Sequence, residues 1–337
     1  MEDILVSISC TSYNHEKYIK QCFDGFLMQK TNFNFEILVH DDASTDNTAA
    51  IIKEYENKYP DLFKCIYQTE NQYSQGIRGI MSRFNFPRAQ GKYIALCEGD
   101  DYWTDPLKLQ KQVDFLEKNR DYGLVHAQMN KLFDATNNIT PINKDRSKTS
   151  FVELLKENPI VTLTTVMRKD LLLRYIEEVQ PQTKNWIAGD TPMWLWFSLH
   201  SKIYFLDEIM ATYRVRLGSM SNVIGSEKYL DYIKSRLSIR KFFVDNYFNS
   251  KKEYLNIIYD SFYKDAEYHA LKIKDVKIIN KITVNYKNNR KKLKAYYFNF
   301  MSFMMKYHYT YYVLFLFYRL YFKLKNKFKL FINLFSQ

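Results

Sequence analysis

The sequence contains little glycine, proline and cysteine, the residues that are abundant in non-globular chains or in small domains held together by a metal ion. It has nine glycines, seven prolines and four cysteines among 337 residues, which excludes the collagen-like and low-complexity classes. None of the cysteines forms a Cys-x-x-Cys pair, so neither a zinc ribbon nor a dithiol redox motif is predicted. Cys10, Cys22, Cys65 and Cys97 each lie in an apolar segment, and we expect buried thiols in a reducing compartment.

Long hydrophobic runs are also missing. The longest uncharged run in the C-terminal region, Tyr307–Tyr318, has twelve residues, whereas a bilayer-spanning helix needs about 20. The first residues, Met1-Glu2-Asp3, are acidic and lead directly into a strand pattern, so we expect no cleaved signal peptide. The hydrophobic fraction of 46% is nevertheless sufficient to fill a globular core.

Positive charge is concentrated near the C-terminal end. Residues 272–337 hold fifteen Lys or Arg and one acidic residue, whereas residues 1–271 hold 34 basic and 36 acidic residues. The net charge of +12 therefore comes from the C-terminal segment. Because the larger part of the chain has no basic excess, we expect no nucleic-acid partner.

Short β-branched runs alternate with helical patterns through the first hundred residues. Strands are predicted over 4–10, 35–40, 62–67 and 92–97. Apolar residues at helical spacing lie between these runs, with Asn14 as the predicted cap of the first helix, and they resume from Pro106. This alternation predicts an α/β fold with a mostly parallel sheet flanked by helices.

The rest of the chain continues this pattern less regularly. Further strands are predicted over 123–127, 160–167 and 209–217, and further helices over 79–90, from 169, from 191 and over 226–272. Residues 128–150 are polar and turn-rich, which indicates a hairpin or loop. We expect three parts, which are a domain over 1–225, a helical extension over 226–272 and a basic, aromatic-rich tail over 273–337.

Polar clusters follow three of the predicted strands. They are Thr11–Asn14, Asp41–Asp46 and Glu98–Asp101. Ligands of parallel sheets bind beyond the carboxyl ends of the strands, so we expect the three clusters to meet at one edge. No G-x-G-x-x-G follows the first strand and no G-x-x-x-x-G-K-[ST] is present, which disfavours a dinucleotide site and a P-loop.

The segment Glu98-Gly99-Asp100-Asp101 places three carboxylates in four residues. Carboxylates this close repel one another and raise each other's pKa values. A hard divalent cation relieves that repulsion and takes substrate phosphates as further ligands. The alternative is a solvated turn that caps the helix beginning at Pro106.

Together these motifs resemble the family 2 inverting glycosyltransferases, whose fold, GT-A, is Rossmann-like. Members of that family have T-S-Y-N after the first strand, D-D-x-S-x-D-x-T after the second, and G-K-Y-I followed by a strand and D-x-D-D. This chain has T-S-Y-N at 11–14, D-D-A-S-T-D-N-T at 41–48 and G-K-Y-I-A-L-C-E-G-D-D at 91–101. The resemblance extends over residues 3–222 and is densest over 3–118.

The resemblance implies a site for a nucleotide-diphosphate sugar. Thr11 and Tyr13 would line the pocket for the base, and Asp42 would hydrogen-bond to a base edge. Arg83 is the favoured candidate, among the arginines of its segment, for contact with the base or the diphosphate. UDP is the implied nucleotide, with GDP and dTDP left open.

The resemblance also implies a divalent cation, Mn²⁺ or Mg²⁺, at Asp100 and Asp101. Asp100 matches the metal-binding Asp of the family's D-x-D motif. Glu98 stands where the first Asp usually is, and it would hold the ribose or assist with the metal. Arg216 stands where the family often has a His. Arginine does not ligate a metal as His does, but it binds a diphosphate in bidentate fashion.

Asp190 precedes a predicted helix that has Pro192 in its first turn, which is an N-cap position. The residues alone therefore leave a purely structural cap open. The resemblance implies that Asp190 is the catalytic base, and the two roles are compatible. Trp186, Trp194 and Trp196 would stack on sugar faces, with at most one of the last two facing the ligand, because residues two apart do not share a helix face.

The implied reaction is an inverting transfer of a sugar to a hydroxyl of a glycan or lipid-linked acceptor, by a metal-assisted single displacement. No processive Gln-x-x-Arg-Trp motif is present, so we expect one sugar per encounter. A non-catalytic nucleotide- or glycan-binding protein is one alternative. A nucleotidyltransferase is another, although it needs a Gly-rich basic loop that residues 11–14 do not supply.

The C-terminal tail combines aromatic with basic residues. Seventeen of the forty residues in 296–335 are Tyr or Phe, interleaved with Lys and Arg. This composition suits the interface of an anionic membrane, and the alternative is a helical domain that packs its aromatics on the body. We expect a peripheral enzyme on the cytoplasmic face of the cell membrane that acts in capsule, lipopolysaccharide or related polysaccharide biosynthesis.

Overall fold

The computed structural model describes residues 3–142, 144–216 and 226–273. Nearly all of the tail predicted over 273–337 therefore lies outside the described residues. The chain divides into two compact units, and the described residues up to Arg216, together with 234–261, belong to the first. The sheet and the candidate site lie in that unit. The domain boundaries predicted near 225 and 272 stay predictions.

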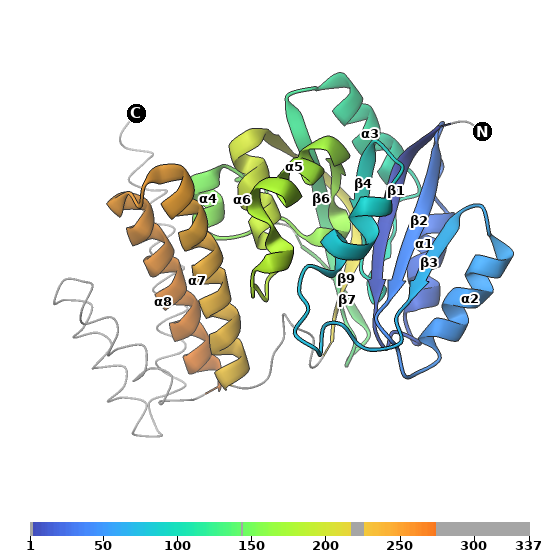
Figure 1. The fold of residues 1–337 in the computed structure, drawn as a ribbon, viewed down its shortest axis with the longest axis horizontal. Coiled ribbons are helices and arrows are strands. Elements are labelled where there is room, and N and C mark those ends of the chain that lie inside the picture. Colours follow the sequence, from blue (N-terminus) through green and yellow to red (C-terminus); the bar gives the residue numbers. More distant parts are fainter. Residues whose placement is uncertain (1–2, 143, 217–225, 274–337) are drawn as a thin grey trace. The chain divides into compact units, whose positions relative to one another are not determined.

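Four parallel strands lie side by side in the N-terminal part of the sheet (Figure 1). In spatial order they are β3 (Phe63–Tyr67), β2 (Asn34–Asp41), β1 (Ile4–Ser12) and β4 (Tyr93–Leu96). The register pairs Ser12 with Asp41, so β1 and β2 end together. The central strands are near-continuous apolar runs because both of their faces are covered. Each predicted strand here is confirmed to within two residues.

The remaining strands make the sheet mixed but largely parallel, as predicted. β8 (Val166–Arg168) pairs antiparallel with both β4 and β6 (Tyr122–Phe133). β9 (Lys202–Val215) runs parallel to β6. β5 (Tyr102–Trp103) pairs antiparallel with β9, and β7 (Asn138–Pro141) pairs antiparallel with β6.

Helices connect and flank the strands, and two more helices follow β9, the last strand along the chain (Figure 1). They are α1 (Ile19–Leu27), α2 (Thr48–Lys58), α3 (Lys108–Lys118), α4 (Phe151–Lys156), α5 (Lys169–Val179), α6 (Thr191–His200), α7 (Ser226–Phe248) and α8 (Lys252–Ile273). α1 buries Ile19, Cys22, Phe23 and Phe26 at helical spacing, as the sequence predicts. The helices expected from 106, 169 and 191 and within 226–272 are confirmed.

The segment 160–167 is not the continuous strand that the sequence predicts. Residues Thr162–Thr164 form a 3-10 turn, and β8 begins only at Val166. The hydroxyl of Thr164 donates to the carbonyl of Val161, and that of Thr165 to the carbonyl of Thr162, both at 2.8 Å. These local bonds offer the backbone an alternative to the strand ladder, so the β-branched composition was misleading here.

Two helix expectations were also wrong in detail. Residues 79–90 contain a π-helical turn, Met81–Asn85, and a 3-10 turn, Phe86–Arg88, in place of an α-helix. Pro87 has no N–H and cannot continue a regular helix. Asn14 does not cap α1, since it has a positive φ of 54° and the helix begins five residues later, at Ile19, with Tyr18 at the N-cap position.

The turn-rich segment over 128–150 contains the expected hairpin, because β6 and β7 are adjacent antiparallel strands. The helix α4, which follows it, was not predicted. Ser150 caps α4 by accepting the backbone N–H of Glu153 at 3.4 Å. A Ser followed three residues later by a Glu is a capping-box signature, so the signal was present in the sequence.

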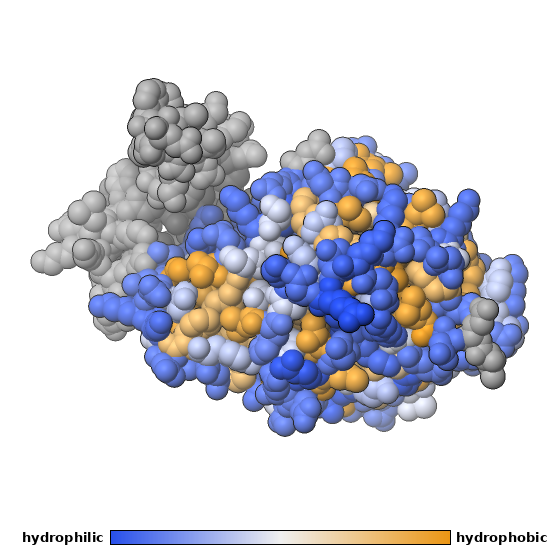
Figure 2. All heavy atoms as spheres, turned by 90° about the horizontal axis from the view of Figure 1, so that it is seen from above, coloured by the Kyte–Doolittle hydropathy of each residue, from blue (hydrophilic) through white to orange (hydrophobic). Residues whose placement is uncertain are grey.

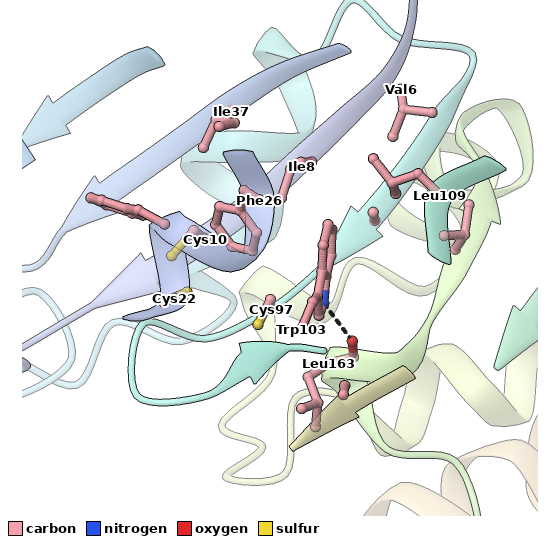
Figure 3. Packing of buried hydrophobic residues seen from close by; sticks show 14 of the residues in the cluster. Val6, Ile8, Cys10, Cys22, Phe26, Ile37, Cys97, Trp103, Leu109 and Leu163 are labelled. Carbon is pink, nitrogen blue, oxygen red and sulfur yellow. Dashed lines mark hydrogen bonds between the residues drawn. The ribbon is translucent and has the colours of Figure 1, made fainter. Parts of the chain in front are cut away.

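Trp103 anchors the core beneath the acidic segment (Figure 3). Its indole N–H donates to the carbonyl of Leu163 at 2.9 Å, and its ring packs edge-on against Phe26 with the centroids 4.8 Å apart. The side chain is 2% exposed. These contacts fix the end of β5, three residues after Asp100.

The cysteines are unpaired, as predicted. Cys10, Cys22 and Cys97 are buried in the same core (Figure 3), and Cys65 is partly buried. Burial raises the pKa of the Cys97 thiol to about 12. These thiols therefore act as small hydrophobic residues.

On the face shown in Figure 2, hydrophobic residues gather in several areas among hydrophilic ones. The exposed large hydrophobic side chains include Tyr13 and Ile139. Among the described residues, none of the helices combines the length and the apolar composition that crossing a bilayer requires.

Candidate functional site

The loops that follow β1 and β2 are tied together by hydrogen bonds. Asn14 accepts the backbone N–H of Thr45 on its Oδ1 atom at 2.8 Å, and its own backbone N–H donates to Ser44 Oγ at 2.9 Å. The backbone N–H of His15 donates to Thr48 Oγ1 at 2.7 Å. The first two polar clusters therefore meet at one edge of the sheet, as predicted.

The acidic segment after β4 joins the same edge. The backbone N–H of Gly99 donates to the carbonyl of Thr11 at 3.0 Å. A Cβ atom on Gly99 would lie 2.9 Å from His15 Nδ1 and 2.6 Å from a methyl carbon of Ile19. Only glycine lets the segment pack this closely, and it brings Asp100 beside His15, with 3.9 Å between His15 Nε2 and Asp100 Oδ2.

Arg214 connects the acidic segment to β9. Its backbone N–H donates to Asp101 Oδ1 at 2.7 Å, and its Nε–H donates to the carbonyl of Asp100 at 2.9 Å. Its Nη2 donates to Gln21 Oε1 at 2.6 Å. Arg214 was not among the residues predicted for the site. Its signal was the alternation that continues from β9 into the residue after it, which puts Arg214 and Arg216 on the same side.

Arg216 lies directly against the acidic segment. Its Nη2 is 2.6 Å from Asp100 Oδ2 and 3.1 Å from His15 Nε2. The guanidinium groups of Arg214 and Arg216 lie over the ring of Tyr18, at 4.5 Å and 5.2 Å from its centroid. β9 thus delivers two cations to the edge where the three clusters meet.

The acidic segment is electrostatically strained. Burial, followed by the charges of Asp100 and Asp190, raises the pKa of Glu98 to about 8. Burial also raises the pKa of Asp101 well above its ordinary value, and the Asp100 and Glu98 charges add to the effect. Burial lowers the pKa of His15. Because the charge of Asp190 is among the causes of the raised pKa of Glu98, Asp190 acts electrostatically on the acidic segment.

Asp190 is the N-cap of α6. Its Oδ1 accepts the backbone N–H of Thr191 at 2.7 Å and the hydroxyl of that residue at 3.3 Å. The cap predicted from the sequence is confirmed. Among the described residues, no hydrogen bond is made by the second carboxylate oxygen of Asp190, so that oxygen is available to a ligand.

The three tryptophans near Asp190 are buried. Trp186 is 8% exposed, and Trp194 and Trp196 are at most 1% exposed. Trp196 donates its indole N–H to Glu178 Oε2 at 2.8 Å. α6 is buried on all sides from Thr191 to Phe197, which is why both of its tryptophans are in the core. With Trp186 also buried, these rings do not present a face on which a sugar could stack, contrary to the prediction.

The residues expected to hold the base have distinct environments. Tyr13 is 43% exposed, and Thr11 is partly buried at the end of β1. Asp42 is 6% exposed, and its two carboxylate oxygens accept the backbone N–H groups of Gln72 and Tyr73 at 2.8 Å and 3.1 Å. Asp42 therefore holds the loop after β3 against the edge where a base would bind.

The arginines of residues 78–88 are engaged by backbone carbonyls. Arg83 is exposed and donates to the carbonyls of Gln182 at 2.6 Å and Arg78 at 3.1 Å. Arg88 donates to the carbonyls of Lys64 and Val39. Arg83 thus joins its segment to the loop that contains Gln182, while Arg88 braces the sheet.

The two carboxylates expected to ligate a cation do not form a ready site. Asp100 already bonds to Arg216, and Asp101 accepts the backbone N–H of Arg214. Burial and the neighbouring charges of Asp100 and Asp190 raise the pKa of Glu98. In the described part of the chain, no group of three His, Cys, Asp or Glu residues is arranged to hold a metal ion. The protein donors present do not fit the divalent cation that the sequence predicts.

Comparison with protein families gives a match over the N-terminal half of the chain. The model described as glycosyl transferase family 2 matches residues 7–176. An uncharacterized protein of Mycobacterium tuberculosis is 37% identical over 217 residues, which cover 62% of this chain and 58% of that protein. This match thus spans little more than half the length of that relative.

A second relative carries a descriptive name. It is the UDP-Glc:alpha-D-GlcNAc-diphosphoundecaprenol beta-1,3-glucosyltransferase WfgD of Escherichia coli, 32% identical over 174 residues, which cover 51% of this chain and 63% of that protein.

Solved structures share the fold at low sequence identity. TarS of S. aureus (residues 1–349) in complex with UDP-GlcNAc is 18% identical with a TM-score of 0.62, covering 83% of this chain and 81% of that one. The mannosyltransferase PcManGT of Pyrobaculum calidifontis, in complex with GDP-Man and Mn²⁺, is 15% identical with a TM-score of 0.54, covering 91% of this chain and 86% of that one.

Proposed function

Since the chain belongs to glycosyl transferase family 2, we propose that it transfers a sugar from a nucleotide-diphosphate sugar to a hydroxyl group of a glycan or lipid-linked acceptor. The observation that carries this proposal is the meeting of the three polar clusters at one sheet edge, with Arg216 against Asp100 and with Asp190 acting electrostatically on Glu98. A cation that can face the diphosphate and a free carboxylate oxygen that can accept a proton are groups that this reaction needs.

The donor nucleotide is assigned to the edge between β1 and the loop after β3. Thr11 and Tyr13 would contact the base, and Asp42 would order the loop that closes over it. Arg83 would contact the base or the diphosphate. A UDP-sugar is the favoured donor, and the UDP-GlcNAc complex of TarS and the UDP-Glc in the name of the E. coli relative support it.

The chemical step is assigned to Asp190. Its free carboxylate oxygen would take the proton of the acceptor hydroxyl, while the hydroxyl oxygen of the acceptor forms a bond to the anomeric carbon of the donor. The bond from the anomeric carbon to the diphosphate oxygen breaks at the same time, and the configuration inverts. Arg216 would stabilise the charge that develops on the leaving diphosphate.

A divalent cation at Asp100 has support from the Mn²⁺ complex of PcManGT. Such an ion would neutralise the diphosphate through substrate phosphates and one or two carboxylates. The donors of this chain fit it poorly, and no step above depends on it.

The acceptor is assigned to the lipid-linked class, and the protein to the surface of a membrane. The diphosphoundecaprenol in the name of the E. coli relative supports a lipid-linked acceptor. The basic, aromatic composition of residues 296–335 supports peripheral binding to an anionic membrane on its cytoplasmic face. Sedimentation of the full chain with anionic but not neutral vesicles, at low salt, tests this part.

A thermal-shift titration tests the donor assignment. UDP, GDP and dTDP are each added with and without Mn²⁺, because a ligand that binds only the folded state raises its stability by RT ln(1 + [L]/Kd). We expect a shift with UDP, followed by release of UDP from a UDP-sugar on incubation. The absence of a shift with every nucleotide would overturn the proposal in favour of a non-catalytic protein.

A further inference from the structure

Arg216 occupies the place at Asp100 where a cation would bind. The distance between Arg216 Nη2 and Asp100 Oδ2 is 2.6 Å, and the two side chains are 25% and 16% exposed. A charge-assisted bond of this length in a partly buried setting is among the stronger polar contacts in proteins. The carboxylate is therefore already neutralised by a group that belongs to the chain.

The side chains of His15 and Asp101, which lie next to Asp100, also have partners within the protein. A guanidinium N–H only donates, so the 3.1 Å contact between Arg216 Nη2 and His15 Nε2 uses the lone pair that a metal would need. The Oδ1 atom of Asp101 accepts the backbone N–H of Arg214 at 2.7 Å. A divalent cation at Asp100 would have to displace Arg216 or sit beside it against electrostatic repulsion.

The position of Arg216 is fixed by its surroundings. Its guanidinium lies over the Tyr18 ring, 5.2 Å from the centroid. The hydroxyl of Tyr18 donates to Asp134 Oδ2 at 2.8 Å, which holds the ring in place. Arg214 lies over the same ring at 4.5 Å, so a second positive charge stands next to the first.

From this geometry we propose that Arg216 supplies, in place of a divalent cation, the positive charge that neutralises the donor diphosphate at Asp100. The inference rests on the proposed function, since it concerns how the same donor site binds its diphosphate. Arginine has five N–H donors in a planar fork, so a diphosphate can share the guanidinium with Asp100. Binding of a nucleoside diphosphate is then independent of added metal.

The test measures the Kd of UDP by isothermal titration calorimetry, in EDTA and in Mn²⁺, for four variants and the wild type. We expect the wild-type Kd to agree within about twofold between the two conditions. Arg216→Ala should weaken binding in EDTA by at least about tenfold, because a charge-assisted bidentate contact is lost. Arg216→Lys should keep part of the affinity in EDTA, since it keeps the charge.

Arg216→His gives the sharpest outcome. An imidazole can ligate a divalent cation, so this variant should bind UDP weakly in EDTA and regain affinity when Mn²⁺ is added. Electron paramagnetic resonance of Mn²⁺ provides a second readout without nucleotide, where we expect bound Mn²⁺ in Arg216→His and none in the wild type. Arg120→Ala, an exposed arginine outside the site, is the control and should behave as the wild type.

The outcomes separate this inference from the proposed function. Wild-type binding of UDP only in Mn²⁺, or equal Mn²⁺ binding by the wild type and Arg216→His, would overturn the role of Arg216 while the donor site stands. Failure of UDP, GDP and dTDP to bind in either condition would overturn the donor site as well. Circular dichroism of each variant confirms that a lost affinity is not lost folding.

Discussion

The backbone N–H of Arg214 donates a hydrogen bond to Asp101 Oδ1 at 2.7 Å, across 113 positions of the sequence. Asp101 is 3% exposed and Arg214 is 7% exposed. The bond joins the segment after β4 to β9, and it fixes where Asp100 and Arg216 meet. Asp101, which the sequence predicts to be a metal ligand, thus serves the structure as an anchor for the site.

Replacing Asp101 should therefore lower stability more than it alters ligand chemistry. Asp101→Ala leaves a buried backbone N–H without its acceptor, and we expect it to lower the free energy of unfolding by about 1–3 kcal/mol. Asp101→Asn keeps an oxygen acceptor at Oδ1 and should lose less. Urea denaturation measures both. Equal losses in the two variants would show that the hydrogen bond is not the source of the stability.

Gly91 permits a close approach that no other residue would. A Cβ atom there would lie 2.5 Å from the backbone nitrogen of Ser7 and 2.6 Å from the carbonyl carbon of Val6. Because rigid backbone of β1 is in the way, Gly91→Ala should destabilise the fold by at least about 1–3 kcal/mol. Gly189→Ala is the matched control, since its Cβ would meet no atom within 4 Å, and it should change stability by no more than about 0.5 kcal/mol.

The loops of the site could be predicted from the sequence because each is specified by a short stretch of consecutive residues. Short motifs at 11–14, 41–48 and 91–101 place polar residues directly after strands, and parallel strands end together. The structure confirms that these loops meet, through bonds such as that of Asn14 with Thr45. Asp190 as a helix cap was likewise a local pattern.

What the sequence did not predict depends on contacts between distant residues. Nothing near Arg214 indicates that its backbone would meet Asp101, or that its guanidinium would share the Tyr18 ring with Arg216. The burial of both Trp194 and Trp196 depends on neighbours that surround α6. The π-helical and 3-10 turns over 81–88 are also poor matches to any simple periodicity.

A buried lysine predicts how stability changes with pH. Lys108 is fully buried, with Nζ 2.8 Å from Gln112 Oε1 and 4.3 Å from the centroid of the Trp103 ring. Burial lowers its pKa from 10.5 to about 7. Between these values the unfolded chain holds a proton that the folded chain lacks, so this residue makes stability rise with pH from about 7 to 10.5.

Lys108→Met removes that titration. We expect the slope of unfolding free energy against pH, between pH 7.5 and 9.5, to fall by up to about 1.4 kcal/mol per pH unit relative to the wild type. Lys118→Met, at an exposed position of the same helix, is the control and should keep the wild-type slope. A slope unchanged by Lys108→Met would mean that Lys108 remains charged in the folded protein over this range.

Asp190 combines a structural and a proposed chemical role, and one substitution separates them. Its Oδ1 accepts the backbone N–H of Thr191 at 2.7 Å, a bond that the amide oxygen of asparagine also makes. Asp190→Asn should therefore keep the cap and the stability of α6, while it removes the group that would accept the proton of the acceptor hydroxyl. We expect turnover to fall by about 10²-fold or more, with the Kd of the nucleotide unchanged.

The measurement is nucleotide release from the donor sugar, alongside urea denaturation and calorimetric binding of the nucleotide. Asp190→Ala loses the cap as well, so it should lower stability by about 0.5–2 kcal/mol in addition to turnover. Asp170→Asn, an exposed carboxylate in the first turn of α5, controls for the loss of one negative charge and should retain turnover. Full turnover in Asp190→Asn would leave this residue only its role as a helix cap and would require another base.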